Sequence, residues 1–425
     1  MSWSRHFRCL PGQGDFPIID FMEAALATGY DGPISLEIFN DQFRAGSPRS
    51  VAIDAQRSLV YLMDQLRGHV SVIAKAVPQL PPRSHCLGVE FLEFAADDRA
   101  AANFARLFTG LGFRKVGEHK SKAVSRWSQG SINLVLNCDN EGFAHAHQIT
   151  HGPSVCAICL KVENADATLD RAQMLLDTPF RQAVGPAELE IPAVRGVGGS
   201  LLYFVDPKSA LGRLWEIDFV APEHPARNSG AGLTVIDHIS QSMHYEEMLS
   251  WLLFYTSLFE VTKTPQLDVI DPGGIVRSQV IQTNDGTLRI ALNASQSQQT
   301  LSSRFLSNYF GSGVQHVAFA TNDVVAAVKQ LRANGVEMLS VSENYYDDLE
   351  ARTDLSAERL NLLRAGNIMY DKDNVGEYLQ AYTATFDGLF FFEIVERRAY
   401  QGFGAINAPI RLAAQARQLN STRLT

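Results

Sequence analysis

The sequence predicts an α+β protein in which a β-α-β-β-β unit occurs twice, each unit curling its sheet into a half-barrel. The first observation is an internal repeat, because residues 85–222 and 233–415 show the same order of strand and helix patterns. The second is the pair of loop-forming stretches at 67–84 and 222–232, which are rich in Pro or in Pro, Gly and Asn. The third is a shorter α/β block, residues 1–66, which precedes both repeats.

The first block has the pattern helix, strand, helix. Helical spacing of apolar residues runs through 18–28, ends at Gly29, and returns over 50–66. Between the two helices, 33–39 has the β-rich sequence Pro-Ile-Ser-Leu-Glu-Ile-Phe. This order is a piece of an α/β fold.

Each repeat begins with a strand and a helix and continues with a β-rich run ending in Leu-Asn. A strand after a glycine, a helix, and a strand holding one carboxylate complete it. A polar tail follows at 416–425. The segments, first repeat before second, are strands 88–94 and 234–239, helices 101–111 and 247–258, β-runs 132–137 and 288–293, strands 152–158 and 311–317, helices 165–176 and 324–333, and strands 215–217 and 392–394.

The composition argues against several classes of function. The 425 residues include 37 Lys and Arg against 46 Asp and Glu, a net charge of −9, whereas nucleic acids and anionic membranes attract basic surfaces. No run approaches the roughly 20 apolar residues of a membrane helix. The N-terminus lacks an apolar signal core and the five cysteines are odd in number, which indicates reduced thiols and a cytoplasmic location.

Three side chains of the second repeat stand out, because His238, His316 and Glu393 each interrupt an otherwise apolar strand. A buried polar group needs a partner, and these three can share one by converging on a metal ion. Two His and one carboxylate with open positions are the ligand set of non-heme Fe(II) oxygenases. Taken singly, such a His is more typical of a hydrogen-bonded core residue and such a Glu of a salt bridge.

The first repeat lacks this set of side chains. At the corresponding places we expect Glu90, Ala157 and Glu216. Without imidazoles, this repeat is expected to act as a scaffold rather than to bind metal.

The second repeat resembles the metal-bearing half of the 4-hydroxyphenylpyruvate dioxygenase family, which has the vicinal-oxygen-chelate, or glyoxalase-like, fold. The first repeat resembles the other half of that family, and the resemblance covers 86–415. The motifs are Val235-Ile-Asp-His238, Gly313-Val-Gln-His-Val-Ala-Phe319, Leu379-Gln380, Phe391-Phe-Glu-Ile394, Gln401-Gly-Phe-Gly404 with Asn407, and, in the first repeat, Phe91-Leu-Glu-Phe94, Trp127-Ser-Gln-Gly-Ser-Ile-Asn-Leu134 and His151-Gly-Pro-Ser-Val-Cys156.

The resemblance implies Fe(II) at His238, His316 and Glu393, and oxidation of an aromatic 2-oxo acid by O2 with decarboxylation and hydroxylation. We expect a closed apolar pocket that includes Tyr382, and a homo-oligomer. The substrate contacts implied by the resemblance are Ser278, Asn293, Gln380, Phe391, Phe403 and Asn407.

The chain departs from the family at the pocket. Ala408 replaces a Phe that closes over the substrate ring, Leu301 replaces a Gln, and Ala291 replaces a Pro. Loss of the ring removes about 0.5–1.5 kcal/mol of stacking. An alternative is therefore a binding or regulatory domain that retains the metal without turnover.

The first block resembles the C-terminal end of a metal-dependent 3-dehydroshikimate dehydratase, a xylose-isomerase-like TIM barrel. The motifs are Arg8-Cys-Leu-Pro-Gly-Gln-Gly-Asp15 and the segment 29–41. The resemblance implies that Glu37 binds a divalent metal and Arg8 the substrate carboxylate. About 66 residues cannot form a barrel of about 250, so we expect a truncated remnant without dehydratase activity unless the missing barrel portion is added.

Other signals favour structural roles. Cys156 and Cys159 lie in one strand pattern and are expected in the core, and His145, His147 and His151 are expected in a surface loop between strands. The basic tail at 411–423 is interpreted either as a helix over the pocket, as in the family, or as a solvated terminal helix.

Overall fold

The computed structural model describes residues 2–68, 79–222 and 230–421. The first range is helical, with α1 (Ser2–His6), α2 (Ile18–Ala27), α3 (Asp41–Ala45) and α4 (Pro48–Arg67). Two expected helices are confirmed as α2 and α4, but the strand expected at 33–39 was wrong, because this segment has no ladder partner among the described strands beyond a single bridge at Asn40. Most of the two expected linkers lies outside the described residues.

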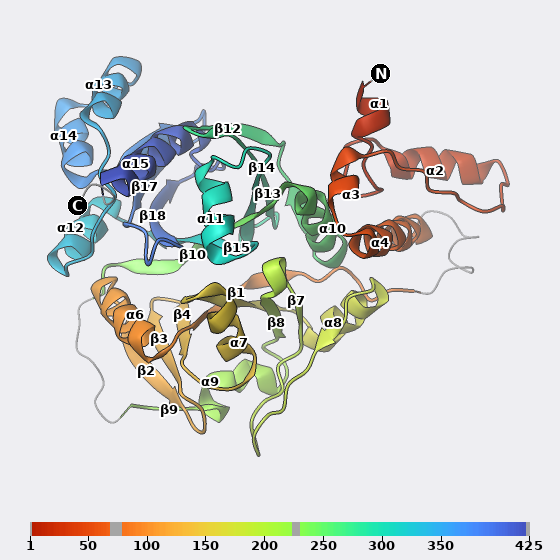
Figure 1. Ribbon diagram of the computed structural model, residues 1–425, viewed down its shortest axis with the longest axis horizontal. Coiled ribbons are helices and arrows are strands. Elements are labelled where there is room, and N and C mark those ends of the chain that lie inside the picture. Colours follow the sequence, from red (N-terminus) through yellow and green to blue (C-terminus); the bar gives the residue numbers. More distant parts are fainter. Residues whose placement is uncertain (1, 69–78, 223–229, 422–425) are drawn as a thin grey trace.

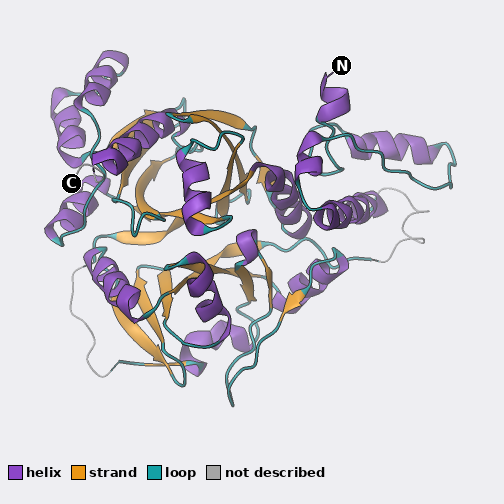
Figure 2. Ribbon diagram, viewed as in Figure 1, coloured by secondary structure: helices purple, strands orange, loops and turns teal. Residues whose placement is uncertain are grey.

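The first repeat forms a unit that we call module 1, and the second forms module 2. Module 1 is one curled sheet of nine strands covered by helices (Figures 1 and 2). The strand order is β6-β7-β8-β5-β1-β4-β3-β2-β9. Its elements are β1 (Cys86–Ala95), α6 (Asp98–Gly110), β2 (Arg114–His119), β3 (Val124–Gln129), β4 (Ile132–Asn137), α7 (Gly142–His151), β5 (Ser154–Val162), α8 (Ala165–Met174), β6 (Pro179–Phe180), β7 (Ala193–Arg195), β8 (Leu201–Val205), α9 (Leu214–Ile217) and β9 (Phe219–Val220).

Module 2 repeats the design. Its strand order is β11-β13-β14-β10-β15-β18-β17-β16, with β12 paired to β13. Its elements are β10 (Leu233–His244), α10 (Met248–Leu258), β11 (Thr262–Lys263), β12 (Leu267–Asp271), β13 (Gly274–Gln282), β14 (Arg289–Ser295), α11 (Leu301–Tyr309), β15 (Gly313–Thr321), α12 (Val324–Ala333), α13 (Glu343–Arg352), α14 (Ala357–Gly366), β16 (Met369–Lys372), β17 (Glu377–Tyr382), β18 (Phe391–Arg398) and α15 (Ala408–Ser421). The expected fold class, two glyoxalase-like β-α-β-β-β modules with half-barrel sheets, is what the chain has.

Strand register defines which residues of the two modules correspond. His238 is opposite Ala318 on β15, and Phe91 is opposite Cys159 on β5. In both ladders the pairing shifts register immediately before this pair, so His238 and Phe91 occupy equivalent positions. The closing strand of module 1 is β8, which pairs in parallel with β5 as β18 pairs with β15. The expected closing strand at 215–217 was wrong, since these residues form helix α9.

The counterparts of the metal-ligand candidates change accordingly. The register places Phe91 where module 2 has His238, and Tyr203 where it has Glu393. Ala157 corresponds to His316, as expected. Glu90 and Glu216 are therefore not the counterparts of the outer two candidates.

The histidine-rich segment is helix α7, not the expected loop. The helix begins at Gly142 and ends before Gly152, whose φ of 72° permits the turn that follows. His147 is buried against module 2, and its Nε2 lies 3.0 Å from the Tyr309 hydroxyl. Cys156 and Cys159 are buried, as expected.

The two modules share one apolar core. Phe94 contacts both Phe390 and Phe392, and Phe104 stacks on Phe386 with ring centroids 4.6 Å apart. Because these rings come from both modules, burial of either sheet depends on the other.

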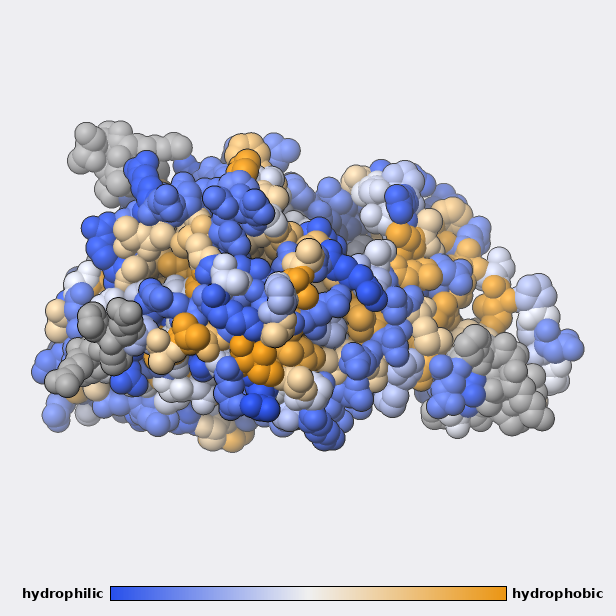
Figure 3. Space-filling view, turned by 90° about the horizontal axis from the view of Figure 1, so that it is seen from below, coloured by the Kyte–Doolittle hydropathy of each residue, from blue (hydrophilic) through white to orange (hydrophobic). Residues whose placement is uncertain are grey.

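The first block packs against both modules beside α10 (Figure 1). Arg57 of α4 donates to the Leu175 carbonyl of module 1, and Gln13 donates to the Leu249 carbonyl of module 2. On the face seen from below, apolar side chains occur in groups between hydrophilic ones (Figure 3). In the described part of the chain, no helix combines the length and apolarity that a membrane crossing requires.

Candidate metal centre

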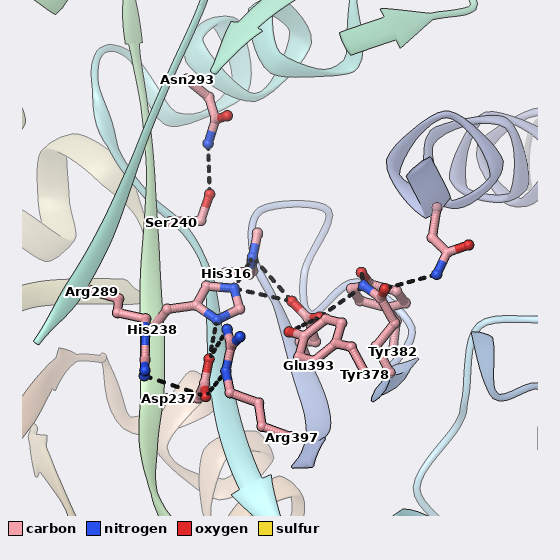
Figure 4. Close-up of polar contacts among 12 residues, drawn as sticks. Asp237, His238, Ser240, Arg289, Asn293, His316, Tyr378, Tyr382, Glu393 and Arg397 are labelled. Carbon is pink, nitrogen blue, oxygen red and sulfur yellow. Dashed lines mark hydrogen bonds and ion pairs between the residues drawn. The ribbon is translucent and has the colours of Figure 1, made fainter. Parts of the chain in front are cut away.

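Three adjacent strands of module 2 place His238 (β10), His316 (β15) and Glu393 (β18) around one point (Figure 4). The two Nε2 atoms are 3.3 Å apart, and Glu393 Oε2 lies 3.2 Å from His238 Nε2 and 3.4 Å from His316 Nε2. All three side chains are buried. The sequence placed them 78 and 77 residues apart, and the sheet brings them together because β15 pairs with both of the other strands.

Asp237 fixes the orientation of His238. Its Oδ1 accepts a hydrogen bond from His238 Nδ1 at 2.8 Å, which leaves Nε2 turned toward the other two ligand candidates (Figure 4). Arg397 donates to the same carboxylate from Nη2 at 2.8 Å, and Arg289 lies 3.7 Å away. Burial opposes ionisation of Asp237, but His238 and Arg397 outweigh it and hold the pKa of Asp237 well below its usual range.

The imidazoles and the carboxylate polarise one another. Burial disfavours charge on His238, but Glu393 and Asp237 outweigh it and raise the pKa of His238 to about 9. Burial lowers the pKa of His316 to about 4. Burial likewise opposes charge on Glu393, yet the two histidines hold its pKa below the usual range. The site therefore favours an ionised carboxylate beside at least one neutral imidazole.

Glu393 is held from its far side. Its Oε1 accepts hydrogen bonds from Gln380 Nε2 at 3.1 Å and from the Tyr378 hydroxyl at 3.3 Å. Asn407 in turn donates to Gln380 Oε1 at 3.0 Å, and Gln380 also contacts the Tyr382 hydroxyl. Oε2 is thereby directed to the histidines.

The donor set fits a first-row divalent metal. Ligands in neighbouring positions of an ion with bonds of about 2.1 Å lie about 3 Å apart, close to the observed separations. The Nδ1 atom of His316 is buried with no hydrogen-bond partner among the described residues, so of the two imidazoles only His238 has a carboxylate on its Nδ1. Among the described residues, this is the cluster of metal-ligating side chains that lies close enough to hold an ion.

A cavity of about 380 Å³, partly open to solvent, lies over the three side chains. Of the expected substrate contacts, Ser278, Asn293, Gln380 and Phe403 line it. Phe391 and Asn407 are not among its lining residues, since Phe391 stacks beneath His316 with centroids 4.9 Å apart and Asn407 is bound to Gln380.

Helix α15 covers this cavity, which is the first of the two interpretations given for the tail. Ala408, Arg411 and Leu412 line the cavity from it. The Arg411 guanidinium lies 5.6 Å from the ring centre of Tyr382. A cationic side chain thus lines the same cavity as the three ligand candidates.

The two candidates of the first block lie apart from this centre. Arg8 and Glu37 approach each other at 3.9 Å, and the Glu37 side chain is 74% exposed. Among the described residues, Glu37 belongs to no group of three or more acidic, histidine or cysteine side chains that could hold a metal ion.

Sequence reasoning missed Asp237, Arg397 and Arg411. Asp237 had a detectable signal, because it is an acid in an apolar strand directly before a candidate ligand. Arg397 and Arg411 had none, since only the folded chain brings them to the site.

Fold and site together define a tandem glyoxalase-type protein with a two-histidine, one-carboxylate cluster that could hold a metal ion. The family model described as "Hydroxyphenylpyruvate dioxygenase, HPPD, N-terminal" matches residues 83–220. The model described as "Glyoxalase/Bleomycin resistance protein/Dioxygenase superfamily" matches residues 235–352. A 4-hydroxyphenylpyruvate dioxygenase from Pseudomonas aeruginosa is 34% identical over 328 residues, which are 75% of this chain and 90% of that protein. The chain belongs to the 4-hydroxyphenylpyruvate dioxygenase family.

The chain also resembles two longer proteins along its whole length. A 3-dehydroshikimate dehydratase from Pseudomonas aeruginosa is 44% identical over 430 residues, covering 100% of this chain and 68% of that protein. A solved structure described as a xylose isomerase-like TIM barrel/4-hydroxyphenylpyruvate dioxygenase fusion protein aligns with a TM-score of 0.85 and 43% identity, over 98% of this chain and 67% of the other. The chain thus spans about two thirds of these relatives, and its first block matches part of the dehydratase.

Proposed function

We propose that this chain oxidises an aromatic 2-oxo acid with O2 in an Fe(II)-dependent reaction. One oxygen atom converts the keto carbon to a carboxylate as CO2 leaves, and the other enters the same molecule as a hydroxyl group. The observation that supports this proposal is the convergence of His238, His316 and Glu393 on the floor of a covered cavity.

The ligand residues would hold the iron through His238 Nε2, His316 Nε2 and Glu393 Oε2. Bound Fe(II) supplies open coordination positions and the electrons that activate O2. Asp237 keeps His238 in the tautomer that presents Nε2, and Gln380 and Tyr378 keep Oε1 of Glu393 occupied. These contacts fix the ligand atoms before any substrate enters.

The remaining polar groups would orient the substrate. Asn293 donates to Ser240 at 2.8 Å, and both line the cavity with Ser278 on the neighbouring strand. Arg411 adds a positive charge that favours entry of an anionic 2-oxo acid.

The other walls would exclude water from the reaction. Val269, Val280 and Phe403 line the cavity, and α15 covers it. Phe403 lies edge-on to His238, with ring centroids 6.1 Å apart. An apolar enclosure protects reactive species formed during oxidation from side reactions.

Metal analysis and oxygen consumption test the proposal. The wild-type chain loaded with Fe(II) should retain about one iron per chain, whereas His316→Ala should retain little; His244→Ala, at an exposed histidine, is the matched control. O2 uptake should then follow addition of 4-hydroxyphenylpyruvate or a related aromatic 2-oxo acid. Equal iron in wild type and His316→Ala would refute the site.

A second candidate function is regulation of a dehydratase, in which this chain would serve as a binding module that retains the metal. Ala408 lines the cavity where the family's ring-closing Phe is absent, and the chain resembles a dehydratase fusion throughout. Iron retention without O2 uptake over a panel of aromatic 2-oxo acids would favour this function.

A further inference from the structure

Module 1 contains a second cavity in the position that the metal-centre cavity has in module 2. It has a volume of about 120 Å³ and is partly open to solvent. Glu93 is opposite Ala157, as Ser240 is opposite His316, and Asn137 occupies the place of Asn293. The hydrogen bond is kept as well, because Asn137 donates to Glu93 Oε1 at 2.7 Å where Asn293 donates to Ser240.

Glu93 is a buried acid, and only one of its two carboxyl oxygens has a hydrogen-bond partner among the described residues. Its residue surface is 8% exposed, and no described residue forms an ion pair with it. Asn137 occupies Oε1, while Oε2 has no hydrogen-bond partner among residues 2–68, 79–222 and 230–421. Burial raises the pKa of Glu93, so a charge on this carboxyl group is less favourable here than in water.

Aromatic side chains form the walls around this carboxyl group. Phe91 packs against Tyr203 and, edge-on, against Trp215, with centroids 6.0 and 5.7 Å apart. Trp215 is fixed in place, since its indole N–H donates to Glu90 and the Arg126 guanidinium lies 4.0 Å from its ring centre. Rigid aromatic walls suit a flat ring.

Two lysines beside the cavity are paired with carboxylates. Lys122 binds Glu188 at 2.8 Å, and Asp218 binds Lys120 at 3.2 Å. These four side chains therefore offer no unopposed charge; Arg181, Gln182 and Glu190 also line the cavity, while Glu93 and the aromatic rings lie together within it.

We propose that this cavity is a second ligand site, distinct from the metal centre, and that it binds an uncharged aromatic molecule carrying a hydroxyl group. The ring packs against the wall formed by Phe91, Tyr203 and Trp215, and the hydroxyl pairs with Glu93 Oε2. Small-molecule sites are usually lined by apolar and aromatic side chains, with a small number of polar groups pointing into them. An anionic ring would meet a carboxyl group, and a cationic ring would require that group to ionise away from water.

Fluorine NMR of the full chain labelled with 5-fluorotryptophan tests this site with phenol as the probe. The sequence has four tryptophans, and Trp215→Phe identifies the resonance of Trp215. Phenol should shift the Trp215 resonance saturably. Glu93→Leu, which removes the hydrogen bond but preserves bulk, should weaken the apparent affinity about tenfold.

The matched control is Asn293→Leu, at the counterpart position in module 2. It should leave the phenol-induced shift of Trp215 unchanged. No shift of Trp215 in the wild type, or the same affinity in Glu93→Leu, would overturn the site. Tighter binding of benzoate or benzylamine than of phenol would overturn the proposed ligand class.

Discussion

Asp237 Oδ1 accepts a hydrogen bond from His238 Nδ1 at 2.8 Å, and Arg397 holds the same carboxylate from the other side. The charge that orients the first ligand candidate is thus itself anchored on β18, the strand that carries Glu393. We therefore expect metal binding at the proposed site to depend on Asp237, which is not itself one of the proposed ligands.

The substitution Asp237→Asn should lower affinity for Fe(II) about 10–100-fold. The amide removes the negative charge that supports His238 and leaves Arg397 without its counterion. Anaerobic metal titration measures the effect. Glu358→Gln, at an exposed acid, should bind the metal as the wild type does; equal affinity in Asp237→Asn would contradict the orienting role.

Asn407→Ala should destabilise the fold by about 1–3 kcal/mol, because it leaves the buried Gln380 Oε1 without its donor. Denaturant unfolding of the metal-free chain gives the comparison. Asn308→Ala on an exposed face should change the free energy of unfolding by less than about 0.5 kcal/mol. A value as small for Asn407→Ala would show that Gln380 finds another donor.

The burial of His147 predicts loss of stability in acid. Burial, with His151 and Arg195 nearby, lowers the pKa of His147 to about 3, whereas the unfolded chain takes up a proton near pH 6.5. Between these values the unfolded state binds more protons, so this contribution is present above pH 6.5 and is lost as the pH falls toward 3.

Melting temperatures across this range test the prediction. His147→Gln should flatten the acid limb relative to the wild type, whose slope from this group cannot exceed about 1.4 kcal/mol per pH unit. His244→Ala should leave the slope unchanged. Parallel limbs for wild type and His147→Gln would remove His147 as the cause.

Ala408→Phe should strengthen binding of an aromatic 2-oxo acid. Ala408 lines the cavity at the start of α15, and a ring there adds about 0.5–1.5 kcal/mol of stacking, or about 2–10-fold in apparent affinity. Steady-state O2 uptake with 4-hydroxyphenylpyruvate gives KM. Ala413→Phe, on the exposed face of the same helix, controls for added bulk, and an unchanged KM in Ala408→Phe would show that the ring does not reach the substrate.

The sequence was most informative where side-chain chemistry conflicted with its surroundings. His238, His316 and Glu393 could be singled out because each is polar in an apolar strand, and the fold class followed from the repeat. Short patterns were less reliable. Residues 215–217 alternate like a strand but form α9, and only pairing partners distinguish three residues of either kind.

The strand register and the role of Gly152 also could not be predicted from the sequence. Tyr203, not Glu216, corresponds to Glu393, because the ladder between β5 and β8 decides the match. Gly152 ends a helix rather than marking a loop, which is why the histidine segment was misjudged. Arg411 reaches the cavity through the path of the folded chain, for which no local pattern exists.

The rings of Phe94, Phe390 and Phe392 pack across the boundary between the modules. Phe392 immediately precedes Glu393, so a polypeptide cut between the modules would lose the wall behind its own ligand strand. Neither half should be obtainable as an independent protein, and exchange of halves between relatives would have to preserve these rings.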